Sequence, residues 1–79
     1  MRPQLLGPLG GDALLIAKRV QQLACTADVV VWVAGDRWFA GPASAAKKIP
    51  AESRVGTYGI GVLLAEIEED MRRFRTRTD

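Results

Sequence analysis

A β-hairpin is the element that most constrains what this chain can fold into. Residues 29–34 read Val-Val-Val-Trp-Val-Ala, a composition typical of a strand with little water on either face. Gly35 and Asp36 follow, and a pair that begins with glycine suits a two-residue turn because glycine tolerates the positive φ that the turn requires. Residues 37–41 then form a second strand, which Pro42 ends because proline lacks a backbone donor.

The length of this turn predicts both the register of the hairpin and the side chains on each of its faces. Residues alternate between the two faces of a strand, so a two-residue loop sorts the hairpin into two sets. The predicted cross-strand pairs are Val33 with Trp38, Trp32 with Phe39 and Val31 with Ala40. One face carries Val29, Val31, Val33, Trp38 and Ala40, and the other carries Val30, Trp32, Ala34, Arg37 and Phe39. A change of one residue in the loop would mix the two sets.

Two amphipathic helices flank the hairpin. Asp12 is the expected N-cap of the first, and apolar residues recur at three- and four-residue steps through 13–26. The same spacing predicts a second helix over 61–75. Its apolar stripe consists of Ile60, Leu63, Leu64, Ile67, Met71 and Phe74. Acidic residues precede basic ones along this helix, which matches the helix dipole. This order places Glu68 four residues before Arg72 and Glu69 four residues before Arg73.

The remaining segments carry shorter signals. Residues 43–48 have the composition of a single helical turn, and residues 54–58 that of a short third strand. Residues 1–11 hold three glycines and two prolines, so we expect an irregular N-terminal arm, and we expect the tail at 76–79 to fray. The 79 residues thus predict a single α+β domain, with both helices on one face of a short antiparallel sheet and the other face open.

The chain lacks the residues that most catalytic and metal sites need. It contains no histidine and one cysteine, Cys25, which excludes His-based nucleophile activation, an internal disulfide and a thiolate-rich metal site. Acidic residues at 66 and 68–70 have basic neighbours one turn on, which favours a solvated helix face over a metal site. The glycines of 56–61 fit no nucleotide-binding motif. We therefore expect no enzymatic activity, no cofactor and no metal.

Charge and hydropathy bear on partners and location. Eleven basic and nine acidic residues give a net charge of +2, too small a surplus to imply nucleic acid by itself. No apolar run approaches the roughly 18 residues that span a membrane. The N-terminus also lacks the apolar region of a signal peptide. We therefore expect a cytoplasmic protein that makes no membrane contact.

Trp32, Phe39 and Arg37 share the face that the helices leave open, which makes them candidates for protein binding. Exposed aromatic residues beside arginine are typical anchors of protein interfaces. The alternative is that a helix or the N-terminal arm covers both rings as core, and the sequence does not decide between the two. If the rings are exposed, Trp32→Ala is expected to weaken binding while leaving the fold largely intact.

Basic residues form a second candidate site, for contact with phosphate or with an acidic surface. These residues are Lys47, Lys48, Arg54, Arg72, Arg73, Arg75 and Arg77. The last four surround Phe74 at the end of the second helix. Arg72 and Arg73 also have carboxylate neighbours, and arginine at a helix C-terminus is ordinary capping chemistry.

Together these features predict a non-enzymatic interaction protein that binds and occludes a surface of a larger protein or ribonucleoprotein complex. A homodimer through the open sheet face is a further expectation. Small size without catalytic residues is typical of accessory inhibitors or adaptors from phages and other mobile elements, of which anti-CRISPR proteins are one kind. That suggestion associates small size and the lack of catalytic residues with a role, and no particular residue supports it. The alternative is a small nucleic-acid-binding protein that uses Lys47, Lys48, Arg54 and the basic end of the second helix.

Overall fold

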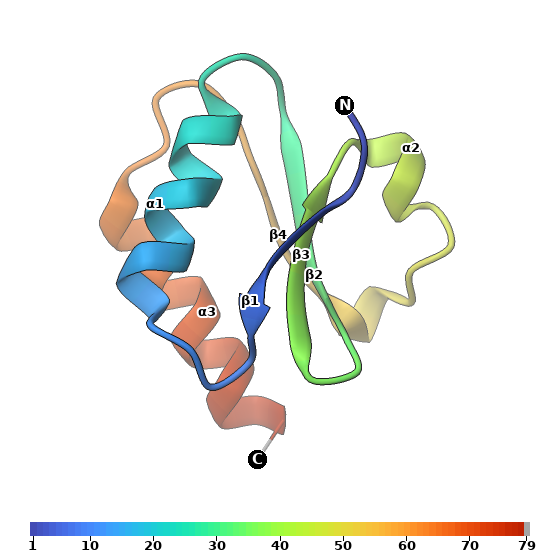
Figure 1. Ribbon diagram of the computed structural model, residues 1–79, viewed down its shortest axis with the longest axis vertical. Helices are drawn as coiled ribbons and strands as arrows, with labels where there is room; N and C mark the ends of the chain where they lie inside the picture. The colour runs from blue at the N-terminus through green and yellow to red at the C-terminus, as the bar shows by residue number, and fades with distance from the viewer. Residues whose placement is uncertain (79) are drawn as a thin grey trace.

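The computed structural model describes residues 1–78 of the chain, which form a four-stranded antiparallel sheet with three helices (Figure 1). The elements are β1 (Gln4–Pro8), α1 (Ala13–Ala24), β2 (Val29–Ala34), β3 (Arg37–Gly41), α2 (Ala43–Ala46), the 3-10 helix η1 (Ala51–Ser53), β4 (Arg54–Tyr58) and α3 (Leu64–Thr78). The strands lie in the order β1-β3-β2-β4. This architecture confirms the expected α+β class, with the two longer helices on one face of the sheet.

The β2–β3 hairpin has the predicted register. Val33 pairs with Trp38, Trp32 with Phe39 and Val31 with Ala40. Gly35 takes a φ of 62°, a left-handed conformation that glycine adopts at no steric cost. The two-residue turn therefore sorts the side chains of the hairpin into the two sets that the sequence predicts.

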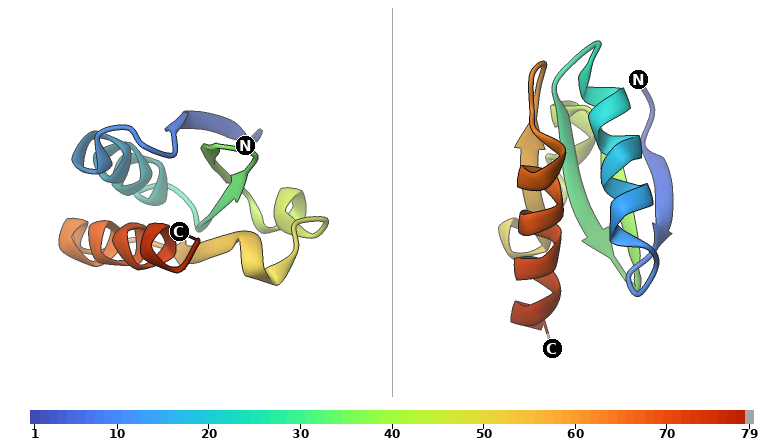
Figure 2. Two further views of the ribbon diagram at one scale, coloured as in Figure 1. Left: turned by 90° about the horizontal axis from the view of Figure 1, so that it is seen from below. Right: turned by 90° about the vertical axis from the view of Figure 1, so that its left-hand side faces the viewer.

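The core face of the sheet carries the fully buried Val29, Val31, Trp38 and Ala40, which pack against α1 and α3. Figure 2 shows the two helices side by side in front of the sheet. From α3, Ile67, Met71 and Phe74 enter this core, as their spacing predicts. The Trp38 indole donates to the Leu9 carbonyl at 3.2 Å, so its polar atom is satisfied although the ring is buried. Asp12 caps α1, as predicted, and accepts from the amide of Leu14 at 3.0 Å.

The N-terminal segment differs from its expectation as an irregular arm. Residues 4–8 form β1, which pairs antiparallel with β3 and contains an irregularity between Leu5 and Gly7. The Leu9 amide also donates to the Asp36 carbonyl at 2.6 Å. The expectation of an irregular arm was wrong here because the unpaired edge of β3 supplies backbone partners that outweigh the weak strand propensity of a Gly- and Pro-rich segment.

Helix α3 begins three residues later and ends later than its apolar spacing predicts. Gly61 adopts a φ of 86°, which lies outside the right-handed helical region, so the helix cannot begin at residue 61, and it starts at Leu64. Residues 60 and 63 consequently lie in a loop. At the other end α3 continues through Thr78, so the expected fraying was wrong for residues 76–78, while position 79 lies outside the described residues.

A second, smaller apolar cluster covers the other face of the sheet. Here α2 packs on Val30 and Trp32, and Ala46 is buried against them. We call this side the α2 face. Arg54 fastens α2 in place because its guanidinium donates to the carbonyls of Ala46 at 2.7 Å and Ile49 at 3.1 Å. The predicted single helical turn and the predicted third strand are therefore both present, and they contact each other.

A β-bulge in β4 lets this strand serve both faces. Val31 pairs with Gly56 and Trp32 with Arg54, so Val55 is an extra residue. Val55 packs on the core side, whereas Arg54 reaches α2 on the opposite side. Gly56 leaves room for the ring of Tyr58, since a Cβ atom there would lie 2.6 Å from the Tyr58 hydroxyl oxygen.

Trp32→Ala is expected to destabilise the protein by about 3–5 kcal/mol, because it leaves a cavity between the sheet and α2. Urea unfolding followed by circular dichroism measures the loss. Leu15→Ala is the matched control, because Leu15 is 62% exposed on α1 and its truncation removes little buried area. Equal stability of the Trp32 variant and the wild type would contradict the buried position of the ring.

Candidate functional site

The structure decides between the two interpretations of Trp32 that the sequence leaves open, and the ring is part of a core. Its side chain is only 4% exposed, and its ring stacks on Phe39 with the ring centres 6.1 Å apart and the planes 11° apart. Phe39 is half-buried, and Arg37 is exposed beside Asp36 at 3.7 Å. The open face that sequence spacing predicts is closed over Trp32 by α2. Trp32 is thus part of the second core and does not offer a surface anchor, while the binding roles of Phe39 and Arg37 stay predictions.

The predicted basic residues do not form one surface. Lys47 and Lys48 follow α2 on one side of the sheet, and the arginines of α3 lie on the other side (Figure 1). The Arg54 guanidinium donates hydrogen bonds to the carbonyls of Ala46 and Ile49. A continuous track for a nucleic-acid backbone therefore does not arise from these seven residues.

Two of the α3 arginines pair within the helix. Arg73 Nε lies 3.3 Å from Glu69 Oε1, which confirms the predicted pair one turn apart. Arg72 pairs with the other oxygen of the same Glu69 carboxylate, three residues before it, and not with Glu68 as its spacing predicts. Both arginine side chains are largely exposed, so these pairs contribute little to stability.

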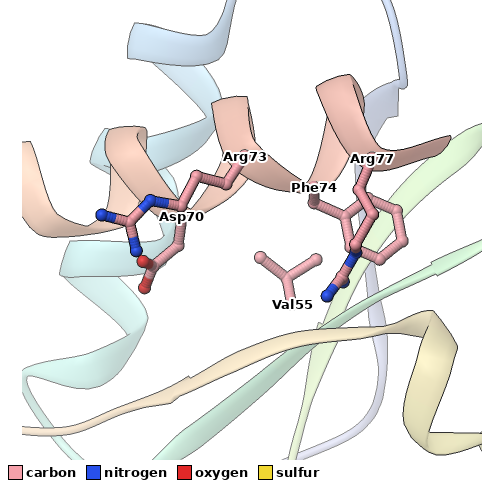
Figure 3. Close-up of a pocket in the computed structure, with 5 residues that line it drawn as sticks. All are labelled: Val55, Asp70, Arg73, Phe74 and Arg77. Atoms are coloured by element: carbon pink, nitrogen blue, oxygen red, sulfur yellow. The ribbon is translucent and has the colours of Figure 1, made fainter. Parts of the chain in front are cut away.

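Arg77 lies in a groove between α3 and the sheet, and its surroundings differ from those of Arg72 and Arg73. Its guanidinium carbon lies 5.3 Å from the centre of the Phe74 ring, a cation–π geometry. No carboxylate in residues 1–78 forms an ion pair with it. Figure 3 shows the Arg77 side chain extending from α3 across the Phe74 ring, with Val55 of β4 opposite.

Two hollows meet at Phe74 and Arg77, and together they form what we call the Arg77 groove. The first, of about 320 Å³, is lined by Val55, Asp70, Arg73, Phe74 and Arg77 (Figure 3). The second, of about 470 Å³, is lined by Leu9, Val33, Gly35, Glu52, Ser53, Phe74 and Arg77. These volumes fall in the range of ligand-binding clefts. The groove thus combines an apolar floor with a guanidinium that is in no ion pair with a carboxylate of residues 1–78.

Tyr58 positions the carboxylate at one end of the groove. Its hydroxyl donates to Asp70 Oδ2 at 2.9 Å. Burial of the ring raises the pKa of Tyr58 well above its ordinary value of 10.0, and the neighbouring Asp70 and Glu66 carboxylates raise it further. The phenol therefore keeps its proton and acts as a donor that orients Asp70.

The loop between β4 and α3 presents exposed apolar side chains that the sequence analysis assigned to a helix. Ile60 is 81% exposed and Leu63 is 69% exposed, the highest values among the large apolar residues of positions 1–78. The signal that identifies this loop is Gly59-Ile60-Gly61, because two glycines around one residue disfavour a helix start. The spacing of apolar residues takes no account of these two glycines, so it placed the start of the helix too early.

Residues 1–78 contain neither a cluster of metal ligands nor a membrane-spanning helix. In positions 1–78, no three His, Cys, Asp or Glu side chains gather closely enough to hold a metal ion. No helix in that range is long and apolar enough to cross a membrane. Cys25 is exposed at the end of α1, where its thiol donates to the Gln21 carbonyl at 3.3 Å.

Tyr58→Phe is expected to lower the free energy of unfolding by about 1–2 kcal/mol near neutral pH, because Asp70 loses its donor. Since the pKa of Tyr58 is raised in the folded state, its contribution is complete below the unfolded pKa of about 10 and is lost as pH rises above it. Urea unfolding at a series of pH values should therefore show the two proteins converging above about pH 10. A pH-independent difference would contradict this account.

Comparisons of the chain with protein-family models, with curated proteins and with solved structures found no match.

Proposed function

We propose that this protein is a non-enzymatic interaction protein that holds an acidic segment of a larger partner in the Arg77 groove. The observation that carries the proposal is the position of Arg77, at the junction of two hollows and over an aromatic ring. Arginine and aromatic residues dominate the binding energy of protein interfaces, above all where water is excluded. A partner carboxylate is the natural ligand for a guanidinium that forms no ion pair with an acidic side chain of residues 1–78.

The remaining lining of the groove supports binding of a chain segment. Phe74 forms an apolar floor, and Val55 and Val33 lie in the two hollows that meet there. Asp70 and Glu52 line one hollow each and offer acceptors to backbone or basic groups of a bound segment. Tyr58 keeps its proton, so it fixes the position of Asp70 and does not serve as a base.

Occlusion of a partner surface is the biological role that we propose for such binding. A protein of 79 residues covers a surface of a larger complex by docking on it, which is how an accessory inhibitor or adaptor acts. A phage or mobile-element origin of the anti-CRISPR kind stays a prediction, because size alone motivates it. Nucleic-acid binding stays the alternative, although the division of the basic residues between two sides of the sheet does not favour it.

Arg77→Glu is expected to reduce partner binding by more than about tenfold, because loss of an interface arginine typically costs upward of about 1 kcal/mol and the reversed charge adds repulsion. The measurement is affinity capture from a lysate of the source cell, with quantitative mass spectrometry of wild-type and variant eluates. Lys48→Glu is the matched control, since it makes the same change of charge at an exposed residue after α2. A partner that both variants retain equally would refute the proposed site.

Binding of a single-stranded or double-stranded oligonucleotide is expected to be undetectable at about 50 mM salt. Fluorescence anisotropy with a labelled 20-base oligonucleotide (a length of roughly two helical turns) measures it. Affinity that falls steeply between about 50 and 200 mM salt would favour the nucleic-acid alternative, because that dependence reports release of counterions from phosphates.

A further inference from the structure

The loop between β4 and α3 carries a second surface, independent of the Arg77 groove. We call residues 59–63 the apolar loop; they contain no charged side chain. Ile60 and Leu63 project into solvent at 81% and 69% exposure. The left-handed φ of Gly61 keeps residue 61 out of the helix, and α3 begins only at Leu64, so both side chains belong to the loop.

A hollow of about 220 Å³ lies directly beside these projecting side chains. Its lining comes from the end of α1 and from the apolar loop: Gln21, Gln22, Cys25, Gly59, Gly61 and Val62. Gln21 Nε2 donates to the Val62 carbonyl at 3.1 Å, which ties the loop to α1. Figures 1 and 2 show the loop and the C-terminal end of α1 at the same end of the molecule. The recess and the loop that carries the two exposed apolar side chains therefore lie at the same end of the molecule.

We propose that a second copy of this chain occupies this surface, with the Ile60 side chain of each protomer entering the hollow of the other and Leu63 packing at its rim. A two-fold axis between two such surfaces makes both contacts at once, because an isologous interface uses the same patch on each subunit. A cavity of about 150 Å³ accommodates benzene, so a hollow of about 220 Å³ has room for a branched aliphatic side chain.

The charges of the surface fit an identical partner. None of the six residues that line the hollow is charged, and neither is any residue of the apolar loop. Two copies therefore meet without like-charge repulsion across the contact. Asp28, which lies against Gly59, is exposed, so solvent screens its charge. A neutral surface gives a strongly acidic or basic partner no complementary charge.

The patch is small, so the dimer is expected to be reversible and weaker than micromolar. Sedimentation equilibrium between about 10 µM and about 1 mM should show the weight-average mass rising from monomer toward dimer. Ile60→Ser and Leu63→Ser should each raise the dissociation constant by at least about tenfold. Leu15→Ser is the matched control, because Leu15 is 62% exposed outside the patch, and it should leave the dissociation constant unchanged.

Cys25 gives an independent readout, because its exposed thiol lines the hollow. Its rate of reaction with Ellman's reagent should fall as the concentration of wild-type protein rises, and it should not depend on concentration in Ile60→Ser. Urea midpoints equal to that of the wild type show that the variants fold. Arg77→Glu, which tests the proposed function, should dimerise like the wild type.

Three results would overturn the inference. The first is a wild type that stays monomeric to about 1 mM. The second is a dimer that both loop variants retain. The third is a dimer that depends on the loop and yet leaves the Cys25 rate independent of concentration, since the hollow would then be uncovered.

Discussion

The whole fold depends on the two-residue turn at Gly35 and Asp36. By setting the register of β2 against β3, it sends Trp38 to one side of the sheet and Trp32 to the other. Each tryptophan then becomes the large side chain around which a layer assembles: α1 and α3 on the first, α2 on the second. A slip of one residue would exchange these positions and leave both layers with the wrong partners.

The elements that the sequence predicts well are those whose signal is local and repeated. The hairpin, the cap at Asp12 and the stripe of Ile67, Met71 and Phe74 are all of this kind. The elements that sequence reasoning misjudged depend on distant partners or on one backbone angle. Strand β1 exists because the edge of β3 was available to it, and the start of α3 is set by Gly61. Spacing carries no information about either.

The candidate site follows the same division. Arg77 was predicted as a contact residue from its place in a basic cluster, yet only the structure distinguishes it from Arg73, which pairs with Glu69. Trp32 was judged from the number of helices able to cover the sheet. Because α2 is one turn long, its weak propensity gave no hint that it covers a face. Side-chain type thus identified the candidate residues, and topology decided which of them are accessible.

The extra residue in β4 lets one strand contact the layers on both faces of the sheet. Val55 and Gly56 are consecutive, yet both lie on the core side of the sheet. Arg54 therefore lies on the opposite side, where it donates to the Ala46 carbonyl of α2. Shortening this strand by one residue would restore strict alternation of side chains between the two faces. Either Arg54 or Val55 would then point to the wrong layer, α2 would lose its hydrogen bonds to Arg54, and the groove would change shape. The length of β4 is therefore as tightly constrained as its composition, and a deletion there would be felt on both sides of the molecule at once.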